Sequence, residues 1–283
     1  MDQRIINLYD RFTHSQIGRK EFMKQLALLT GSTAAAMTML PLLQNNYVAA
    51  KPFHSDDITV ANITYPGVDG DVKAVLAKPK GASGVGGVVV IHENRGLNPH
   101  IIDVTKRLAA EGFITLGVDA LSVFGGTPED EDKGRELIGQ LDREKTVQNY
   151  LKGLAYLRHT DGGNGKVGCM GFCWGGAMAG QLAVNDPNLQ ASVAYYGTQP
   201  DAADVPNIKA SLLLHYGGLD ERVNAGIPAY EEALKANGVD YQLYVYEGAN
   251  HAFNNDTSPT RYDEQAAKLA WGRTVSFFRS KLA

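Results

Sequence analysis

The first stretches with a clear pattern of apolar and polar positions predict strands. Residues Ile58–Tyr65 and Val72–Lys78 alternate or run apolar, and turn residues rich in Gly, Pro and Asp separate them. That arrangement predicts a hairpin. The nearly continuous apolar run Val85–His92 follows a glycine-rich turn. Such a run is typical of a strand that is buried on both faces, as in a parallel sheet.

Beyond this point the pattern predicts strands and helices in alternation. The further strands are expected at Phe113–Asp119, Lys166–Met170, Ala191–Tyr196, Ser211–Tyr216 and Tyr241–Tyr246. The helices are expected at Pro99–Glu111, Glu129–His159 with a break at Leu141-Asp142, Trp174–Val184, Ala225–Asn237 and Pro259–Leu282. An antiparallel start followed by strand–helix units predicts an α/β fold with a mostly parallel central sheet and helices on both faces.

The first fifty residues have a different composition, so we expect an N-terminal extension over 1–50 and one α/β domain over 51–283. Residues Leu26–Leu43 carry no charge, follow the basic segment Gly18–Lys24 and precede the small residues Val48-Ala49-Ala50. This layout is typical of a secretory signal and resembles a twin-arginine signal in which Lys20 replaces the second arginine. It favours a periplasmic over a cytoplasmic location. The alternative is an amphipathic helix packed on the domain. The run is too weakly apolar to predict a stable membrane span.

Composition excludes several classes of function. The formal net charge is −4, so neither a nucleic-acid footprint nor a polybasic membrane patch is expected. With only two cysteines, neither a disulfide framework nor a four-ligand zinc site is expected. No spacing of histidines or carboxylates suggests a metal, and we expect no cofactor.

A glycine-rich turn marks the candidate nucleophile. The segment Gly171–Gly176 lies between a predicted strand and a predicted helix, and it fits the G-x-S-x-G nucleophile elbow with Cys173 in place of serine. A helix N-terminus at that point would favour a thiolate. The alternative is a buried structural cysteine. A redox pair with Cys169 is not expected, because four residues of strand separate two Cα atoms by ~13 Å, which is too far for a disulfide.

Two later loops contain the candidate partners of Cys173. Asp220 follows the strand at Ser211–Tyr216 and can either orient an imidazole or cap the next helix. Among the seven histidines, only His251 follows the last strand, at the active edge of an open α/β sheet, whereas His14 and His54 lie in the N-terminal tail. The order Cys173, Asp220, His251 is that of α/β-hydrolases.

The loop after the third predicted strand, His92–Gly96, is expected to complete the site. In this fold it supplies one oxyanion-hole amide, here that of Asn94, and the residue after the nucleophile, Trp174, supplies the other. Glu93 is aimed at the same pocket, or else forms a surface salt bridge with Arg95.

With these motifs the chain resembles the dienelactone hydrolases, especially a branch that has a His-Glu-Asn-Arg-Gly loop and a signal-like extension. The resemblance covers residues 56–283 and rests on His92–Gly96, Gly171–Gly176, Asp220 and the His-Ala-Phe sequence at 251–253.

The resemblance implies a Cys-His-Asp triad that opens an enol-lactone, and a role for Glu93 as the carboxylate that pairs with the resting thiol and moves when substrate binds. Well-studied members hold the substrate carboxylate with two arginines. At those positions this chain has Leu121–Phe124 and Asn255. We therefore expect neutral substrates to be preferred.

These features predict a carboxymethylenebutenolidase-like hydrolase of a small ester or lactone that acts through an acyl-Cys intermediate. Cys173 attacks, His251 transfers the proton and Asp220 orients His251. By loop position we expect further side chains near the substrate pocket: Arg95, Phe124, Trp174, Tyr196 and Phe253. The alternatives are a catalytically idle scaffold that binds a ligand or partner, and a thiol oxidoreductase, which the cysteine spacing disfavours.

Overall fold

The centre of the molecule is one eight-stranded sheet in the strand order β1-β2-β4-β3-β5-β6-β7-β8. The computed structural model describes residues 1–47 and 52–283. Its strands are β1 Ile58–Pro66, β2 Asp71–Pro79, β3 Val85–Ile91, β4 Ile114–Val118, β5 Gly163–Phe172, β6 Ala191–Tyr195, β7 Ser211–Gly217 and β8 Tyr241–Tyr246. Strand β2 pairs antiparallel with both β1 and β4. The other neighbours pair in parallel. The predicted fold class is confirmed.

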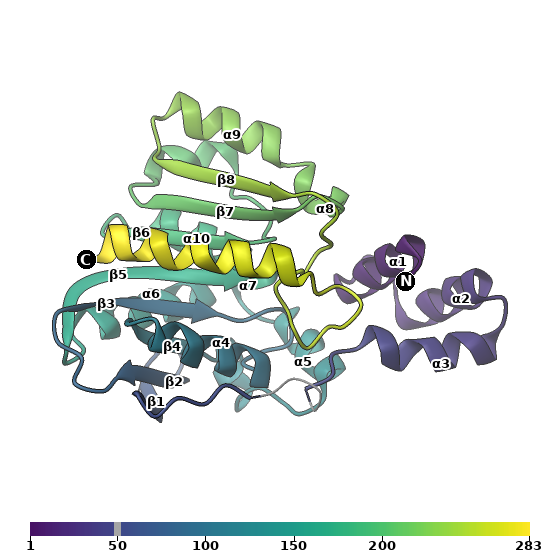
Figure 1. Cartoon of the computed structure of the whole chain (residues 1–283), viewed down its shortest axis with the longest axis horizontal. Helices are drawn as coiled ribbons and strands as arrows, with labels where there is room; N and C mark the ends of the chain where they lie inside the picture. Colours follow the sequence, from purple (N-terminus) through teal and green to yellow (C-terminus); the bar gives the residue numbers. More distant parts are fainter. Residues whose placement is uncertain (48–51) are drawn as a thin grey trace.

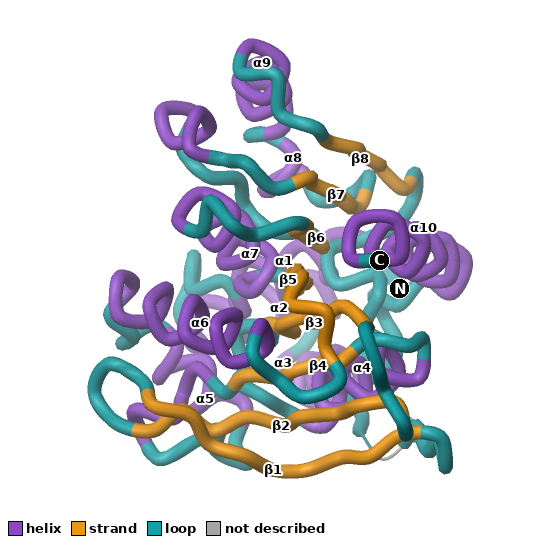
Figure 2. Tube along the Cα trace, turned by 90° about the vertical axis from the view of Figure 1, so that its left-hand side faces the viewer, coloured by secondary structure: helices purple, strands orange, loops and turns teal. Residues whose placement is uncertain are grey.

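Helices cover both faces of this sheet, and Figure 2 shows α4 and α10 on one side and α6, α7 and α9 on the other. The helices of the body are α4 Pro99–Ala110, α5 Glu131–Ile138, α6 Arg143–Arg158, α7 Trp174–Asn185, α8 Glu221–Asn224, α9 Ile227–Ala236 and α10 Glu264–Leu282, with 3-10 turns η1 Ala120–Phe124 and η2 Ala202–Asn207. Two buried apolar clusters fill the layers on either side of the sheet.

Capping side chains explain where the predicted helices begin. The Asp142 carboxylate accepts a hydrogen bond from the Lys145 amide, so α6 begins after it, at the predicted break. The Asp263 carboxylate accepts from the Ala266 amide, so α10 begins at Glu264 and not at Pro259 as predicted. The predicted helix from Ala225 is also wrong at its start, because Gly226 separates the short α8 from α9.

Three helices precede the sheet and project from one end of the molecule (Figure 1). They are α1 Gln3–Thr13, α2 Arg19–Thr30 and α3 Thr33–Leu43. The buried residues of α1 recur at helical spacing, and they include Ile5, Tyr9 and Phe12. They form an apolar cluster with residues of α2 and α3.

The uncharged run Leu26–Leu43 is not one helix. Gly31, at φ 87°, ends α2, and α3 continues at an angle of 109°. In the described part of the chain no single helix is long and apolar enough to cross a membrane, and the bent pair α2–α3 meets that test only when the two are taken together. The small residues Val48-Ala49-Ala50 and the expected boundary at residue 50 lie outside the described residues.

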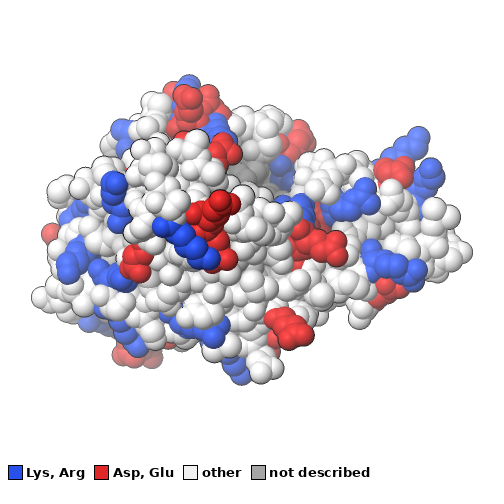
Figure 3. Space-filling view, turned by 90° about the horizontal axis from the view of Figure 1, so that it is seen from above, with Lys and Arg blue, Asp and Glu red and all other residues white. Residues whose placement is uncertain are grey.

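Charged side chains of both signs are intermixed on one face of the molecule. On the face drawn in Figure 3, lysines and arginines alternate with aspartates and glutamates and form no broad patch of one sign. This mixture fits the small formal net charge of −4.

Candidate active site

Cys173 lies at the sharp turn between β5 and α7. Its backbone has φ 57° and ψ −115°, a conformation that costs a non-glycine residue about 1–3 kcal/mol and is concentrated at functional sites. Glycine is required on both sides of the turn. A Cβ on Gly171 would lie 1.9 Å from the Gly175 carbonyl oxygen, and one on Gly175 would lie 2.5 Å from the His92 carbonyl oxygen. The turn places the Cys173 side chain at the N-terminus of α7, at 7% exposure.

The structure brings His251 and Asp220 together beside Cys173. His251 Nδ1 lies 2.6 Å from Asp220 Oδ2, and both residues are buried. Nε2 of His251 is buried without a hydrogen-bond partner in the described structure. The other Asp220 carboxylate oxygen accepts from the Val223 amide at 3.3 Å, so Asp220 both caps α8 and holds His251.

A second histidine contacts the same thiol, and sequence reasoning missed it. His14, directly after α1, has Nε2 3.2 Å from Cys173 Sγ. Its Nδ1 lies 3.1 Å from Asp10 Oδ1 and 2.8 Å from the Asp10 carbonyl oxygen. The His14 and His251 rings meet edge to face at 4.7 Å. The prediction that His14 lies in a tail away from the site is wrong, because it assumed that the extension does not reach the sheet edge. The spacing of Asp10 and His14 at the end of an amphipathic helix was the available signal.

Residues of the body hold this end of α1 in place. The Asn94 side-chain amide donates to the Thr13 carbonyl at 2.7 Å. Arg135 donates to the Phe12 carbonyl at 2.9 Å, and its guanidinium lies 4.2 Å above the Phe12 ring.

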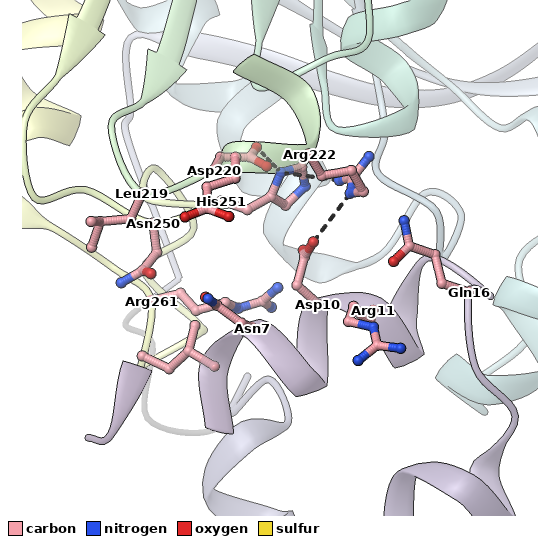
Figure 4. A pocket seen from close by; sticks show the side chains of 12 residues that line it. Asn7, Asp10, Arg11, Gln16, Leu219, Asp220, Arg222, Asn250, His251 and Arg261 are labelled. Atoms are coloured by element: carbon pink, nitrogen blue, oxygen red, sulfur yellow. Dashed lines mark hydrogen bonds and ion pairs between the residues drawn. The ribbon is translucent and has the colours of Figure 1, made fainter. Parts of the chain in front are cut away.

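An ion pair fixes α1 from a third side. Figure 4 shows Asp10 extending from α1 toward Arg222, next to the His251–Asp220 pair. Arg222 Nε lies 3.2 Å from Asp10 Oδ2. The carboxylate of Asp10 therefore contacts a guanidinium on α8 with one oxygen and His14 with the other.

The electrostatic environment favours a thiolate at Cys173. Burial opposes ionisation of the thiol, but the positive charges of His14 and His251 outweigh it and lower the pKa of Cys173 to about 6. Burial also opposes charge on His251, whereas Asp220, Asp10 and the thiolate raise its pKa well above the usual value. The pKa of His14 is likewise raised, by Cys173 and Asp10 against burial. By contrast, burial raises the pKa of Cys169 to about 12.

The loop after β3 lies beside this centre. Asn94 and Trp174, the two residues expected to supply oxyanion-hole amides, both line the cavity that contains Cys173. Trp174 is the first residue of α7, where backbone N–H groups have no partner within the helix. Its indole stacks on the buried ring of His92, with 5.2 Å between centroids.

Glu93 is buried at 4% exposure, and its carboxylate accepts a hydrogen bond from Asn255 at 2.9 Å. Arg95 Nε lies 3.2 Å from Glu131 Oε2, and its guanidinium donates to the Tyr9 hydroxyl. The alternative of a surface salt bridge between Glu93 and Arg95 is therefore wrong.

A cavity of about 240 Å³ reaches the thiol between α1 and the body. Its lining includes Tyr196, as expected from the sequence, and two cations that the sequence did not indicate, Arg135 and Arg222. Other expected pocket residues lie elsewhere. Phe253 is fully buried against Tyr196, and Phe124 lines a separate cavity of about 300 Å³. Arg95 is buried behind Tyr9, outside this lining.

The side chains of His14, Cys173 and His251 form a donor set that could hold a metal ion. One ring nitrogen each of His14 and His251 and the Cys173 sulfur lie within 4.8 Å of one another. Nitrogen and thiolate donors suit Zn²⁺. Nothing in the sequence spacing indicated this cluster, because 159 positions separate His14 from Cys173.

The family of the chain follows from comparison with known proteins. The sequence model of the dienelactone hydrolase family matches residues 72–282. The chain belongs to this family. It is therefore a hydrolase of the carboxylic-ester type. The matched part of this dienelactone hydrolase-family chain includes Cys173, Asp220 and His251, whereas His14 precedes it.

Relatives and solved structures agree with this membership. A protein of Saccharolobus solfataricus, named "Putative carboxymethylenebutenolidase", is 32% identical over 253 residues, which span 77% of this chain and 97% of the relative. The crystal structure of a dienelactone hydrolase-like promiscuous phosphotriesterase from metagenomic libraries aligns with TM-score 0.72 and 27% identity, over 80% of this chain and 100% of the other. Dienelactone hydrolase from Anabaena variabilis shares the fold with TM-score 0.63 and 24% identity, over 80% and 100% of the two chains.

Proposed function

We propose that this dienelactone hydrolase-family enzyme cleaves a small ester or lactone through an acyl-Cys intermediate on Cys173. The observation that carries the proposal is a cysteine in a left-handed backbone conformation at a strand-to-helix turn, with a buried Asp–His pair beside it. A nucleophile, a base and a group that orients the base are the elements of a catalytic triad. The name of the Saccharolobus relative supports the lactone as a substrate class.

The proposed steps conserve atoms and protons. The Cys173 thiolate attacks the carbonyl carbon, and the negative charge that develops on oxygen is met by the Asn94 and Trp174 amides. The C–O bond to the leaving group breaks as protonated His251 donates its Nε2 proton to that oxygen. Neutral His251 then takes a proton from water, which attacks the thioester. Collapse releases the acid and restores the thiolate, while Asp220 keeps the imidazole oriented.

Glu93 is proposed to modulate the thiol, as the family resemblance implies. In this structure its carboxylate is directed to Asn255. Burial first, and then the charges of Glu93 and Cys173, raise the pKa of Tyr196, so the Tyr196 ring lies within the field of both groups. Glu93→Gln is expected to change the pH dependence of Cys173 alkylation. An unchanged profile would leave Glu93 as a structural partner of Asn255 only.

The test is a screen of short-chain esters and lactones with wild type beside Cys173→Ala. We expect Cys173→Ala to lose turnover and keep the fold, because the thiol makes no hydrogen bond on which the turn depends. Cys169→Ala is the matched control, since Cys169 is also a buried free cysteine, on β5. Full activity in Cys173→Ala would overturn the proposal. An idle scaffold is disfavoured, because ligand binding alone does not require the paired Asp220 and His251.

A further inference from the structure

We propose that His14, supplied by the N-terminal helix, is a second catalytic imidazole that holds the Cys173 thiolate and works with Asp10. This inference rests on the proposed function of Cys173 as the nucleophile. It assigns to the N-terminal segment a part in the chemistry itself. The matched family range begins at residue 72, so none of its positions corresponds to this group.

Two Asp–His pairs converge on one sulfur. On one side Asp220 binds His251 at 2.6 Å. On the other, Nδ1 of His14 donates to the Asp10 backbone carbonyl at 2.8 Å and lies 3.1 Å from the Asp10 carboxylate, while Nε2 of His14 lies 3.2 Å from Sγ. A carbonyl or carboxylate acceptor on one ring nitrogen fixes the ring orientation and leaves the other nitrogen facing the reacting atom. Asp10 supplies the carbonyl acceptor and a nearby negative charge to His14, and Asp220 supplies a carboxylate acceptor to His251.

The proton balance of this arrangement is simple. The S–H bond of Cys173 breaks as its proton moves to Nε2 of His14, which gives a thiolate and an imidazolium. His14 then keeps that proton through the cycle as a fixed cation beside the sulfur. His251, which in the resting enzyme carries a second proton taken from solvent, remains free to protonate the leaving group and then, as the neutral imidazole, to activate water. Without His14, the single imidazole of His251 would have to stabilise the thiolate and also exchange protons with the leaving group and water.

The charged groups that face His14 come from its own helix and from three other elements, and they act in both directions. Asp10 is on the same helix, His251 comes from the loop after β8, Arg222 from α8 and Arg135 from α5. Protonated His251 and the two arginines oppose a cationic imidazole at His14, whereas the Cys173 thiolate and Asp10 favour it. However, Asp10 pairs with Arg222, and Arg135 is directed to the Phe12 carbonyl and to Asp132 on its own helix.

The helix forms a wall of the site and leaves the sulfur reachable. The cavity of about 240 Å³ contacts both His14 and Cys173 while α1 is in place. The side chain of His14 is 16% exposed. Cleavage after the signal-like segment would remove His14, so a processed enzyme would lack this second imidazole.

The experiment measures the rate of Cys173 alkylation by iodoacetamide against pH in the full-length chain, with EDTA present. In His14→Gln we expect the midpoint of the pH profile of Cys173 alkylation to rise by about one to three pH units, the range for loss of a close opposite charge. At pH 7 we expect kcat to fall roughly 10²-fold or more, as for loss of a positioned acid–base group, with KM changed less. Asp10→Asn should shift the midpoint in the same direction by a smaller amount.

His100→Gln is the matched control. His100 Nδ1 also lies 3.1 Å from an aspartate oxygen, that of Asp256, but His100 does not line the cavity with Cys173. The His100→Gln variant should leave the alkylation midpoint and kcat unchanged. Because His14→Gln could loosen α1, His14→Ala is assayed with added imidazole, which should restore alkylation at neutral pH if the missing group is the imidazole.

Each other outcome overturns the inference. An unchanged alkylation midpoint in folded His14→Gln, with Cys173→Ala inactive, removes the role of His14 and leaves the proposed function intact. A gain of activity in His14→Ala would make α1 an inhibitory cover. No rescue by imidazole together with a lowered melting temperature would make His14 structural. Loss of wild-type activity in EDTA would mean that the three donors hold a metal ion.

Discussion

Cys169 on β5 and Cys173 at the turn after it have thiol pKa values that are shifted in opposite directions, because their surroundings differ. Cys169 Sγ packs against the Ser192 hydroxyl and lies within 3.9 Å of the Ala179 carbonyl. Cys173 lies between two imidazoles. Burial alone raises a thiol pKa, and only the adjacent positive charges reverse its direction.

In the wild-type chain, only Cys173 should therefore be alkylated near neutral pH, and the rate should vary with pH there. Below a pKa of about 6 the Cys173 thiol is protonated, so its reaction with iodoacetamide should fall as pH decreases through that value. Cys169, with a pKa of about 12, should remain unlabelled at neutral pH. Peptide mass mapping from pH 5 to 9 checks this, and labelling of Cys169 ahead of Cys173 would contradict it.

The histidines on β7 and after β8 should separate into a structural and a catalytic one. His215 is buried between Tyr246 and Thr274, with a pKa that burial lowers to about 3. His215→Gln should cost roughly 1–3 kcal/mol of stability, the penalty for unpaired buried polar groups, and leave kcat largely intact.

His251→Gln should instead lower kcat by several orders of magnitude with a small change in stability, in line with triad variants of other enzymes. Thermal melts and steady-state kinetics on the same preparations distinguish the two effects. A folded but inactive His215→Gln would mean that the base has been misassigned.

At the scale of elements, the elbow depends on close backbone approach. Strand β5 and helix α7 come so near at Gly171 that a Cβ would overlap the Gly175 carbonyl. Gly171→Ala should therefore lose more than about 3 kcal/mol of stability or fail to fold, because the obstacle is backbone and cannot move aside.

Gly272 on α10 provides the matched control. No atom lies within 4 Å of a Cβ placed there, so Gly272→Ala should stabilise the protein by about 0.5–1 kcal/mol through helix propensity. Chemical denaturation of both variants tests the pair. Equal stability of the two would show that the turn relaxes at little cost.

For the whole molecule, the charge of the cavity bears on the choice of substrate. Arg135 and Arg222 line it, but both guanidiniums already have partners on or beside α1. We expect neutral esters or lactones to exceed their carboxylate analogues in kcat/KM, by roughly ten- to a hundredfold for one absent charge-assisted contact of ~1.5–3 kcal/mol.

A dienelactone and its methyl ester, compared at fixed pH and salt, form the matched pair. A tenfold preference for the free acid would reverse the prediction. In that case Arg135→Gln, rather than a change at the buried Arg95, is the first variant to make.

Features that depend on local pattern could be predicted from the amino-acid sequence. Period and turn residues predicted the eight strands and their parallel core, and strand β8 begins and ends where the alternation does. The glycines of the elbow reflect a geometric requirement of the turn, and the chain order Cys173, Asp220, His251 matches that of α/β-hydrolases, so these three could be named as candidates without a structure. A helix start that depends on a single capping side chain is harder to predict: α10 begins after Asp263, whereas the pattern predicted a start at Pro259.

The other groups that surround the Cys173 thiol could not be predicted in this way, because they come from distant parts of the chain. The packing of α1 on the loops after β3 and β8 brings His14 across 159 positions to Cys173, and no periodicity reports a contact of that kind. Contacts between elements of the body likewise direct Arg95 to Glu131 on α5, and the cavity lining takes Arg135 from α5 and Arg222 from α8. Local pattern reports which face of a segment is buried, whereas the partner of that face depends on how all the segments fill space together.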